Sequence, residues 1–183
     1  GTNGTALYYM LNNSASNNMN ASQVPDADGR EYSTITYSSS HVTVTTDYRD
    51  GLGQLDNFFY LGATPDGLSP AINTSTYKYC KIRYRTTSTT VCLNIHAGGQ
   101  PVKYEEYMIG DGQWHDVIID MQSSTGWNGN LTNFRIDIDR VRGQTDKVDF
   151  ACVAFFSTLA NAKAYDINAL TPDGADIIGA KLG

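Results

Sequence analysis

The residues of this chain best suited to binding chemistry alternate with apolar residues in three stretches. In residues 80–85, CKIRYR, an outer row with Lys81 and Arg83 alternates with Cys80, Ile82 and Tyr84. Because successive side chains of a strand point to opposite faces, the charged row lies outside the core, and Tyr79 belongs to it. Residues 91–96 and 133–140 alternate in the same way, and their outer rows include Asn94, His96, Arg135 and Asp137. If the three strands share one sheet, these side chains share one outer face.

Such a face has two interpretations. Tyr79 provides an apolar ring, and the guanidinium, imidazole and carboxylate groups provide fixed donors and acceptors, which is what a polar ligand platform requires. The alternative is a solvated face with ion pairs, which is the ordinary condition of half-exposed antiparallel strands. Since charge on one face is what such strands normally show, the alternation by itself favours the solvated face over the ligand platform.

The same alternation predicts the state of the three cysteines. Cys80 lies in the inward row of its strand, whereas Cys92 lies in the row opposite Val91, Leu93 and Ile95. Residues 77–86 and 91–96 are predicted to be the two strands of a hairpin around a polar turn, and cysteines on opposite faces of a hairpin cannot bring their β-carbons to disulfide distance. Cys152 lies within a continuous apolar run and is expected to be a small buried side chain. We therefore predict three free thiols.

Composition excludes several classes of partner. The 183 residues have a formal net charge of -6, and no cluster of Lys and Arg is long enough to follow a phosphate backbone, so nucleic-acid binding is not expected. No apolar run approaches the roughly 20 residues that a membrane-spanning helix needs. The chain begins without a methionine, and we expect it to be a module of a larger protein.

Short alternating stretches separated by polar turns predict an all-β fold. They occupy residues 31–37, 41–46, 57–62, 77–86, 91–96, 103–110, 114–121, 133–140 and 148–156, and only residues 157–166 have helical character. This spacing is typical of an antiparallel β-sandwich, and the absence of alternating long helices argues against a parallel sheet. We predict one domain over residues 1–183, with residues 1–30 a loosely assigned edge and residues 166–183 a tail.

Four segments of the chain resemble a known group of domains. GDGQWHDVIIDM is followed by GWNGNLTNFRIDIDR and KVDFACVAFF, and YKYCKIRYRT precedes them. These segments resemble jelly-roll carbohydrate-binding modules, which are galactose-binding-domain-like β-sandwiches of bacterial surface or secreted glycan-processing proteins. The resemblance covers residues 40–165. It implies a jelly-roll fold and an extracellular or cell-surface location.

The resemblance also implies site residues. Members of this group bind sugars by aromatic stacking and polar contacts, and many hold a structural calcium ion. Trp114 and Trp127 match the two characteristic tryptophans, which in such domains usually pack at the rim of the sandwich, so core packing is expected for each. Trp127, in a Gly/Asn loop, is the better ligand candidate of the two. Asp149 matches an acidic position that binds calcium in related families, and Asp26 and Asp28 add a fragment of a calcium loop. The expected sugar-binding residues are Tyr79, Arg83, His96, Arg135, Asp137, Trp127 and Tyr48.

Enzymatic alternatives have weaker support in the sequence. A glycosidase needs two carboxylates on either side of one bond, and the candidates Glu105, Glu106, Asp137 and Asp139 cannot be paired from sequence. A jelly-roll polysaccharide lyase would need a base beside a cationic group, for which His96, Tyr79, Arg83 and Arg135 are candidates. We therefore expect a non-catalytic module that binds an oligosaccharide or polysaccharide weakly. A structural or adhesive domain without sugar binding is the first alternative, and a glycan-active enzyme is the second.

Overall fold

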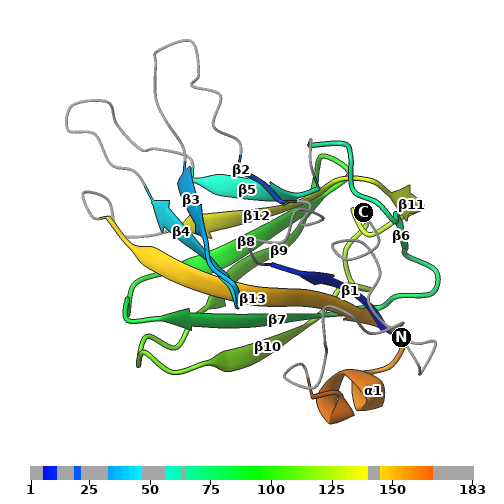
Figure 1. Cartoon of the computed structure of the whole chain (residues 1–183). Coiled ribbons are helices and arrows are strands. Elements are labelled where there is room, and N and C mark those ends of the chain that lie inside the picture. The colour runs from blue at the N-terminus through cyan, green and yellow to red at the C-terminus, as the bar shows by residue number, and fades with distance from the viewer. Residues whose placement is uncertain are drawn as a thin grey trace.

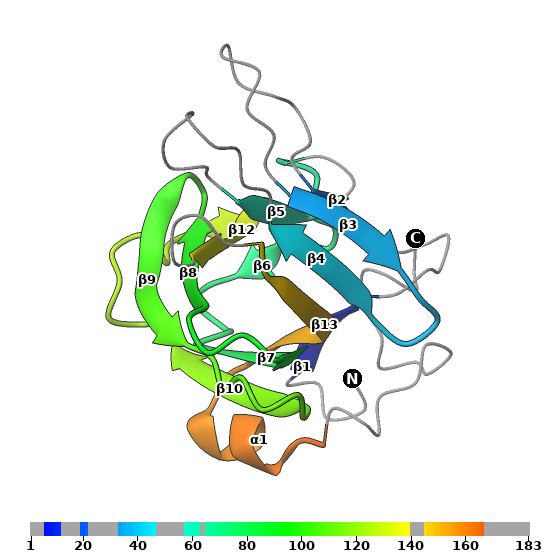
Figure 2. The ribbon, with the colours of Figure 1, turned by 90° about the vertical axis from the view of Figure 1, so that its left-hand side faces the viewer.

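The described part of the chain forms two antiparallel sheets that face each other (Figure 1). The computed structural model describes residues 6–11, 19–21, 33–46, 57–62, 65–139 and 145–166. Within these residues a six-stranded sheet has the order β10-β7-β13-β4-β3, with β1 also paired to β13. A five-stranded sheet has the order β2-β5-β12-β8-β9, and Figure 2 shows its strands β9 and β8 on the left, with β13, β4 and β3 of the six-stranded sheet to their right. The predicted all-β antiparallel sandwich is confirmed.

The strands are short, as the sequence predicts. The six-stranded sheet consists of β10 (His115–Asp120), β7 (Tyr79–Thr86), β13 (Lys147–Phe156), β4 (Val42–Thr46), β3 (Ser33–Tyr37) and β1 (Ala6–Met10). The five-stranded sheet consists of β2 (Met19–Ala21), β5 (Phe58–Leu61), β12 (Phe134–Asp139), β8 (Cys92–Ala97) and β9 (Gln100–Tyr107). A small ribbon pairs β6 (Ile72–Asn73) with β11 (Asn130–Leu131), and the short helix α1 (Leu159–Ala164) follows β13.

Aromatic side chains from both sheets fill the space between them. The rings of Phe59 on β5 and Phe150 on β13 lie 5.2 Å apart, as do those of Phe134 on β12 and Phe155 on β13. All four side chains are fully buried. The inward row predicted from alternation in residues 133–140 is therefore confirmed.

The predicted pairing of residues 77–86 with residues 91–96 is wrong. β7 pairs with β10 and β13, whereas β8 pairs with β12 and β9 in the other sheet. The intervening residues 87–90 therefore pass from one sheet to the other. Local alternation defines the faces of each strand but carries no information about which distant strand becomes its neighbour. As a consequence, the outer rows of β7 and β8 lie on opposite sides of the sandwich.

β13 is covered on both of its faces, as its continuous apolar sequence predicts. Phe155 faces the core between the sheets, whereas Cys152, Ala154 and Phe156 belong to a second cluster on the outer side that includes Ala162 of α1. Thr158 caps the N-terminus of the helix, and its side chain accepts a hydrogen bond from the backbone N–H of Asn161. The helix predicted in residues 157–166 thus covers part of the six-stranded sheet.

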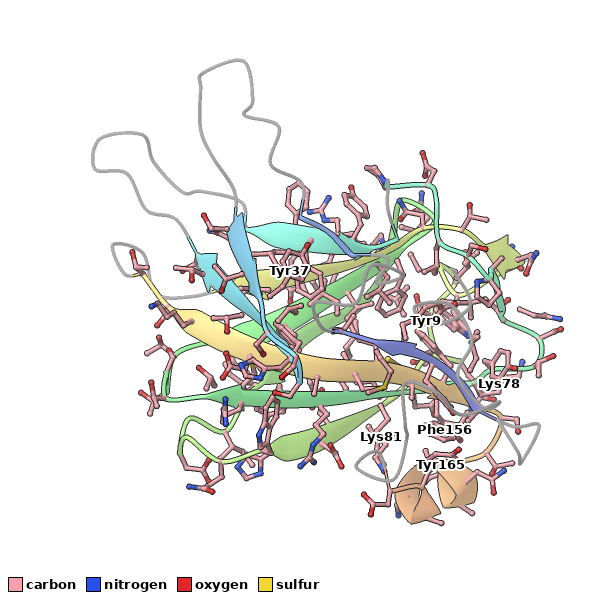
Figure 3. All side chains as sticks on the ribbon, viewed as in Figure 1. Tyr9, Tyr37, Lys78, Lys81, Phe156 and Tyr165 are labelled. Carbon is pink, nitrogen blue, oxygen red and sulfur yellow. The ribbon has the colours of Figure 1, made fainter. Side chains whose placement is uncertain are left out.

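Lys81 is buried beneath α1 although it belongs to the charged row of β7. Its side chain is 4% exposed, and Nζ donates hydrogen bonds to the carbonyl oxygens of Ala162 and Tyr165, each at 2.6 Å. Figure 3 shows Lys81 beside Tyr165 and Phe156, between the sheet and the helix. The expectation that this row is solvent-facing therefore fails at Lys81, because the helix end covers it and supplies its acceptors.

All three cysteines are free and buried, which confirms the predicted thiol state. Cys80 belongs to the core between the sheets, and Cys152 lies on the other side of β13 beneath α1. Cys92 lies in the outer row of β8, as predicted, but is only 8% exposed. Cys80 and Cys92 are therefore separated by lying in different sheets, and not only by the opposite orientation of their side chains.

The N-terminal edge is better integrated than predicted where it is described. β1 pairs with β13 over its whole length, and Tyr8 and Tyr9 are almost fully buried. The Tyr9 hydroxyl donates a hydrogen bond to the carbonyl oxygen of Pro70 at 2.6 Å. Of the predicted tail, residues 167–183 lie outside the described residues.

Candidate functional site

Three of the predicted site residues come together on the outer side of the five-stranded sheet. Arg135 of β12 is directly opposite His96 of β8 on one side and Tyr60 of β5 on the other. Two positions along β12, Asp137 is opposite Asn94 and Phe58. Since cross-strand partners point to the same side of a sheet, these side chains share one surface. We call it the aromatic face and define it by Phe58, Tyr60, Asn94, His96, Tyr104, Arg135 and Asp137.

An ion pair fixes the centre of the aromatic face. Arg135 Nε lies 2.5 Å from Asp137 Oδ1, and Arg135 Nη2 lies 2.7 Å from Asp137 Oδ2. The guanidinium carbon lies 4.1 Å from the centroid of the Phe58 ring, in cation–π geometry. His96 Nδ1 lies 3.6 Å from Asp137 Oδ2. Two-point contact and stacking hold the guanidinium in one plane, so its remaining N–H groups point in fixed directions.

Aromatic rings lie on both sides of this ion pair. The ring of Tyr60 is 5.7 Å from that of Phe58, and the ring of Tyr104 is 5.9 Å from that of His96 in edge-to-face geometry. Tyr104 is 56% exposed, which is high for a tyrosine in a strand. The face therefore combines an accessible ring with oriented donors and acceptors.

An irregularity in β9 brings Tyr104 to this surface. The register changes from Leu93↔Glu106 to Ile95↔Lys103, so β9 uses one more residue than β8 over this interval. Glu105 has a φ of 58°, and its backbone N–H donates a 2.7 Å hydrogen bond to the side-chain oxygen of Asn94. A bulge of this kind redirects side chains, and bulges are common beside functional sites.

The remaining predicted residues of the first sheet lie on the opposite side of the sandwich. Tyr79 and Arg83 belong to β7, and Arg83 Nη1 donates to Asp116 Oδ1 at 3.1 Å on β10. The Tyr79 hydroxyl accepts a 3.2 Å hydrogen bond from Gln122 Nε2. The predicted single platform is therefore wrong, because its residues are divided between the two sheets. The lyase group built from the same residues is not assembled either.

Trp127 packs in the core and does not face a ligand. It is 8% exposed, its ring stacks on Phe155 with centroids 5.9 Å apart, and its Nε1 donates to the carbonyl oxygen of Tyr77 at 2.8 Å. Trp114 is the half-exposed tryptophan, and the guanidinium of Arg85 lies 4.5 Å from its ring centroid. The core packing expected for Trp127 is therefore confirmed, and Trp114 is the more exposed of the two tryptophans. Tyr48 lies outside the described residues.

The surroundings of Asp149 do not fit the calcium ion that the resemblance implies. Arg85 Nη2 lies 2.8 Å from Asp149 Oδ2, and Thr43 Oγ1 donates to Asp149 Oδ1 at 2.5 Å. A guanidinium thus takes the place beside this carboxylate where a cation would be bound. Among the described residues, no three His, Cys, Asp or Glu side chains gather as a metal site would require. Asp26 and Asp28 lie outside the described residues.

The sequence contains a signal for the outward orientation of Phe58 and Tyr60, which are not among the predicted site residues. Phe59 and Leu61 belong to the core, so NFFYLG alternates and its other row faces outward. Tyr104 had no such signal, because its orientation depends on the bulge at Glu105.

Sequence comparisons identify no relative, since no family model and no curated protein match the chain. Solved structures do show the fold. A xylan-binding module of family 86 (CBM86) from Roseburia intestinalis matches with a TM-score of 0.55 and 11% identity, over 87% of this chain and 99% of that one. A mutant of CBM29-2, a family 29 carbohydrate-binding module, matches with a TM-score of 0.54 and 11% identity, over 90% of this chain and 99% of that one. The chain therefore has the jelly-roll β-sandwich fold of carbohydrate-binding modules.

Within the part of the chain that the structure describes, no helix has the length and apolar character needed to cross a membrane.

Proposed function

We propose that this chain is a non-catalytic carbohydrate-binding module and that its aromatic face binds an oligosaccharide or polysaccharide. The observation that carries the proposal is the exposed ring of Tyr104 next to the fixed groups His96, Arg135 and Asp137. The C–H side of a sugar ring is apolar and stacks on an aromatic ring, whereas its hydroxyl groups need oriented donors and acceptors. The fold shared with carbohydrate-binding modules supports this proposal.

The arrangement of the aromatic face favours an extended ligand that crosses the strands. Tyr60, Arg135 and His96 lie side by side on β5, β12 and β8, and Tyr104 follows on β9. Neighbouring strands are about 4.8 Å apart, so the strands of Tyr60 and Tyr104 are separated by about 14 Å. This distance exceeds one sugar ring, and affinity is therefore expected to rise with chain length. For an open surface we expect dissociation constants in the micromolar to millimolar range, or roughly 4 to 8 kcal/mol.

A binding role agrees better with the face than catalysis does. The buried carboxylate of Asp137 is 7% exposed and accepts both hydrogen bonds of the Arg135 pair. Because both of its oxygens accept from the guanidinium, this carboxylate is poorly placed to donate or abstract a proton. We further propose that the module acts in a secreted or cell-surface protein, where polysaccharides are accessible.

A glycan array probed with the isolated chain tests the proposal. The expected result is binding to one class of linear glycan, with affinity increasing from the disaccharide to longer oligomers in calorimetry. Failure of every arrayed glycan to bind at millimolar concentration would contradict it and favour a structural or adhesive domain.

A further inference from the structure

A polar hollow of about 510 Å³ opens on the outer side of the six-stranded sheet, opposite the aromatic face. Four strands contribute to it, and its cross-strand row is in register: Arg85 is opposite Asp149, Asp149 is opposite Thr43, and Thr43 is opposite Thr36. We call it the cationic hollow and define it by Thr36, His41, Arg85, Thr87, Lys147 and Asp149. Thr36, Arg85, Lys147 and Asp149 lie in paired strands, whereas His41 and Thr87 directly adjoin strand ends, so the backbone of the sheet positions most of the hollow.

The charges of Arg85 and Asp149 cancel within the cationic hollow. Arg85 Nε and Nη2 lie 2.9 and 2.8 Å from Asp149 Oδ2, and His41 Nε2 lies 3.8 Å from Asp149 Oδ1. These contacts orient the guanidinium and the imidazole. The pair leaves no net charge for a ligand to neutralise, so the residual charge of the hollow depends on Lys147.

Lys147 provides that residual charge. It is exposed, it lies two residues before Asp149 on the same side of β13, and no carboxylate of the described residues lies within ion-pair distance of its ammonium group. The exposed hydroxyl groups of Thr36 and Thr87 line the same hollow, and within the described ranges neither donates a hydrogen bond. The hollow is therefore a positive site with hydroxyl donors in a chain whose formal net charge is -6.

Trp114 lies next to two residues that line the cationic hollow. Its ring lies 4.5 Å from the Arg85 guanidinium carbon and 5.6 Å from the ring of His41, in edge-to-face geometry. Both neighbours line the hollow, so the indole is held in place and remains half-exposed. A rigid indole beside an ammonium group suits a ligand that carries both a ring and a negative charge.

We propose that the cationic hollow is a second binding site, which takes a carboxylate or sulfate group carried by a saccharide. Lys147 and the hydroxyl groups of Thr36 and Thr87 bind the anionic group, and Trp114 contacts the adjoining ring. The site is separate from the aromatic face, because the two lie on opposite sides of the sandwich. Binding of a neutral glycan to the aromatic face and binding of an anionic one to the hollow are therefore independent events.

The two tryptophans of the chain give a direct readout in a ¹H–¹⁵N spectrum, because Trp114 lies next to residues that line the hollow and Trp127 is buried in the core. The probes are trigalacturonate, a sulfated galactose disaccharide and neutral galactotriose, and Trp114→Phe assigns the two indole signals. We expect one or both anionic probes to shift the Trp114 signal saturably, while the Trp127 signal stays in place. Comparison of the two anionic probes identifies the preferred group, and galactotriose is expected to leave Trp114 unchanged.

Charge variants test the role of Lys147. Lys147→Gln is expected to weaken binding of the anionic probe by about fivefold and Lys147→Glu by about tenfold or more, since an exposed ion pair contributes up to about 1 kcal/mol. Lys163→Gln removes an exposed lysine from α1 and serves as the matched control with unchanged binding. Tyr104→Ala on the aromatic face is also expected to leave this binding unchanged. Three results would each overturn the proposal. They are an unchanged Trp114 signal with both anionic probes, an equal shift of that signal with galactotriose, and equal effects of Lys147→Gln and Lys163→Gln on binding.

Discussion

Arg135 and Asp137, two residues apart on β12, form a two-point ion pair on the outer side of the five-stranded sheet, with N–O distances of 2.5 and 2.7 Å. Side chains at positions i and i+2 of a strand point to the same side, and here the carboxylate is 7% exposed and the guanidinium side chain 22% exposed. The pair is thus shielded enough to be rigid and open enough for the guanidinium to contact a ligand. This relationship makes the aromatic face a preorganised surface.

Asp137→Asn is expected to weaken glycan binding by about tenfold and to lower the free energy of unfolding by about 1–3 kcal/mol, because Arg135 loses its charged partner. Calorimetry and urea denaturation measure the two effects. Asp116→Asn is the matched control, since it breaks the Arg83–Asp116 pair on the other sheet and should leave glycan affinity unchanged. Equal losses of affinity in the two variants would show that the Arg135 pair has no special role.

Lys81→Met is expected to lower the free energy of unfolding by about 1–3 kcal/mol. The substitution keeps much of the side-chain volume. It removes the buried donor that hydrogen-bonds the carbonyl oxygens of Ala162 and Tyr165 at the end of α1. Urea denaturation measures the change. Lys163→Met, at an exposed position of the same helix, should cost no more than about 0.5 kcal/mol. A Lys81→Met protein as stable as the wild type would contradict the anchoring role of Lys81.

Trp127→Phe is expected to destabilise the fold by about 1–3 kcal/mol without changing the affinity of the folded protein for a glycan. The ring stacked on Phe155 becomes smaller, and the hydrogen bond to the Tyr77 carbonyl oxygen is lost. Thermal unfolding and calorimetry separate the two quantities. A variant of normal stability that no longer binds glycan would restore Trp127 as a ligand residue.

Alternation in the sequence predicted faces correctly but not neighbours. It placed Cys80, Phe134 and Ile136 inward and His96, Arg135 and Asp137 outward, because the side-chain period of a strand is a local property. It could not show that β7 and β8 belong to different sheets, since that depends on pairing with β10, β13, β12 and β9. Short strands and polar turns were enough to predict the fold class. The predicted platform that combined Tyr79 and Arg83 with His96 was wrong, because these residues lie in different sheets.

Two features of the candidate site could not be predicted from the local sequence: the exposure of Tyr104 and the different exposure of the two tryptophans. The exposure of Tyr104 depends on a bulge whose key residue, Glu105, has a positive φ, and no residue type in KYEEY demands one. The contrast between buried Trp127 and half-exposed Trp114 depends on how loops close over the core. By comparison, the outward orientation of Phe58 and Tyr60 on β5 could be predicted, because they alternate with the core residues Phe59 and Leu61.

The thiol state gives a fourth prediction. Burial raises the pKa of the Cys80 and Cys152 thiols well above the ordinary value, so both should resist alkylation in the native protein at neutral pH. Mass spectrometry after denaturation without reductant should then count three alkylated cysteines. A count of one would reveal a disulfide and contradict the strand assignment of β7 and β8.

Glycan binding by the aromatic face can be measured by calorimetry of matched tyrosine variants. Tyr104→Ala and Tyr60→Ala remove rings from the face, and Tyr37→Ala removes a 47% exposed ring from β3 of the other sheet (Figure 3). With the best glycan from the array, the first two variants are expected to bind about tenfold more weakly, since an aromatic contact is worth about 0.5–1.5 kcal/mol beyond the area it buries. Tyr37→Ala should bind as the wild type does. Undiminished binding by folded Tyr60→Ala and Tyr104→Ala, or an equal loss in all three variants, would contradict glycan binding by this face.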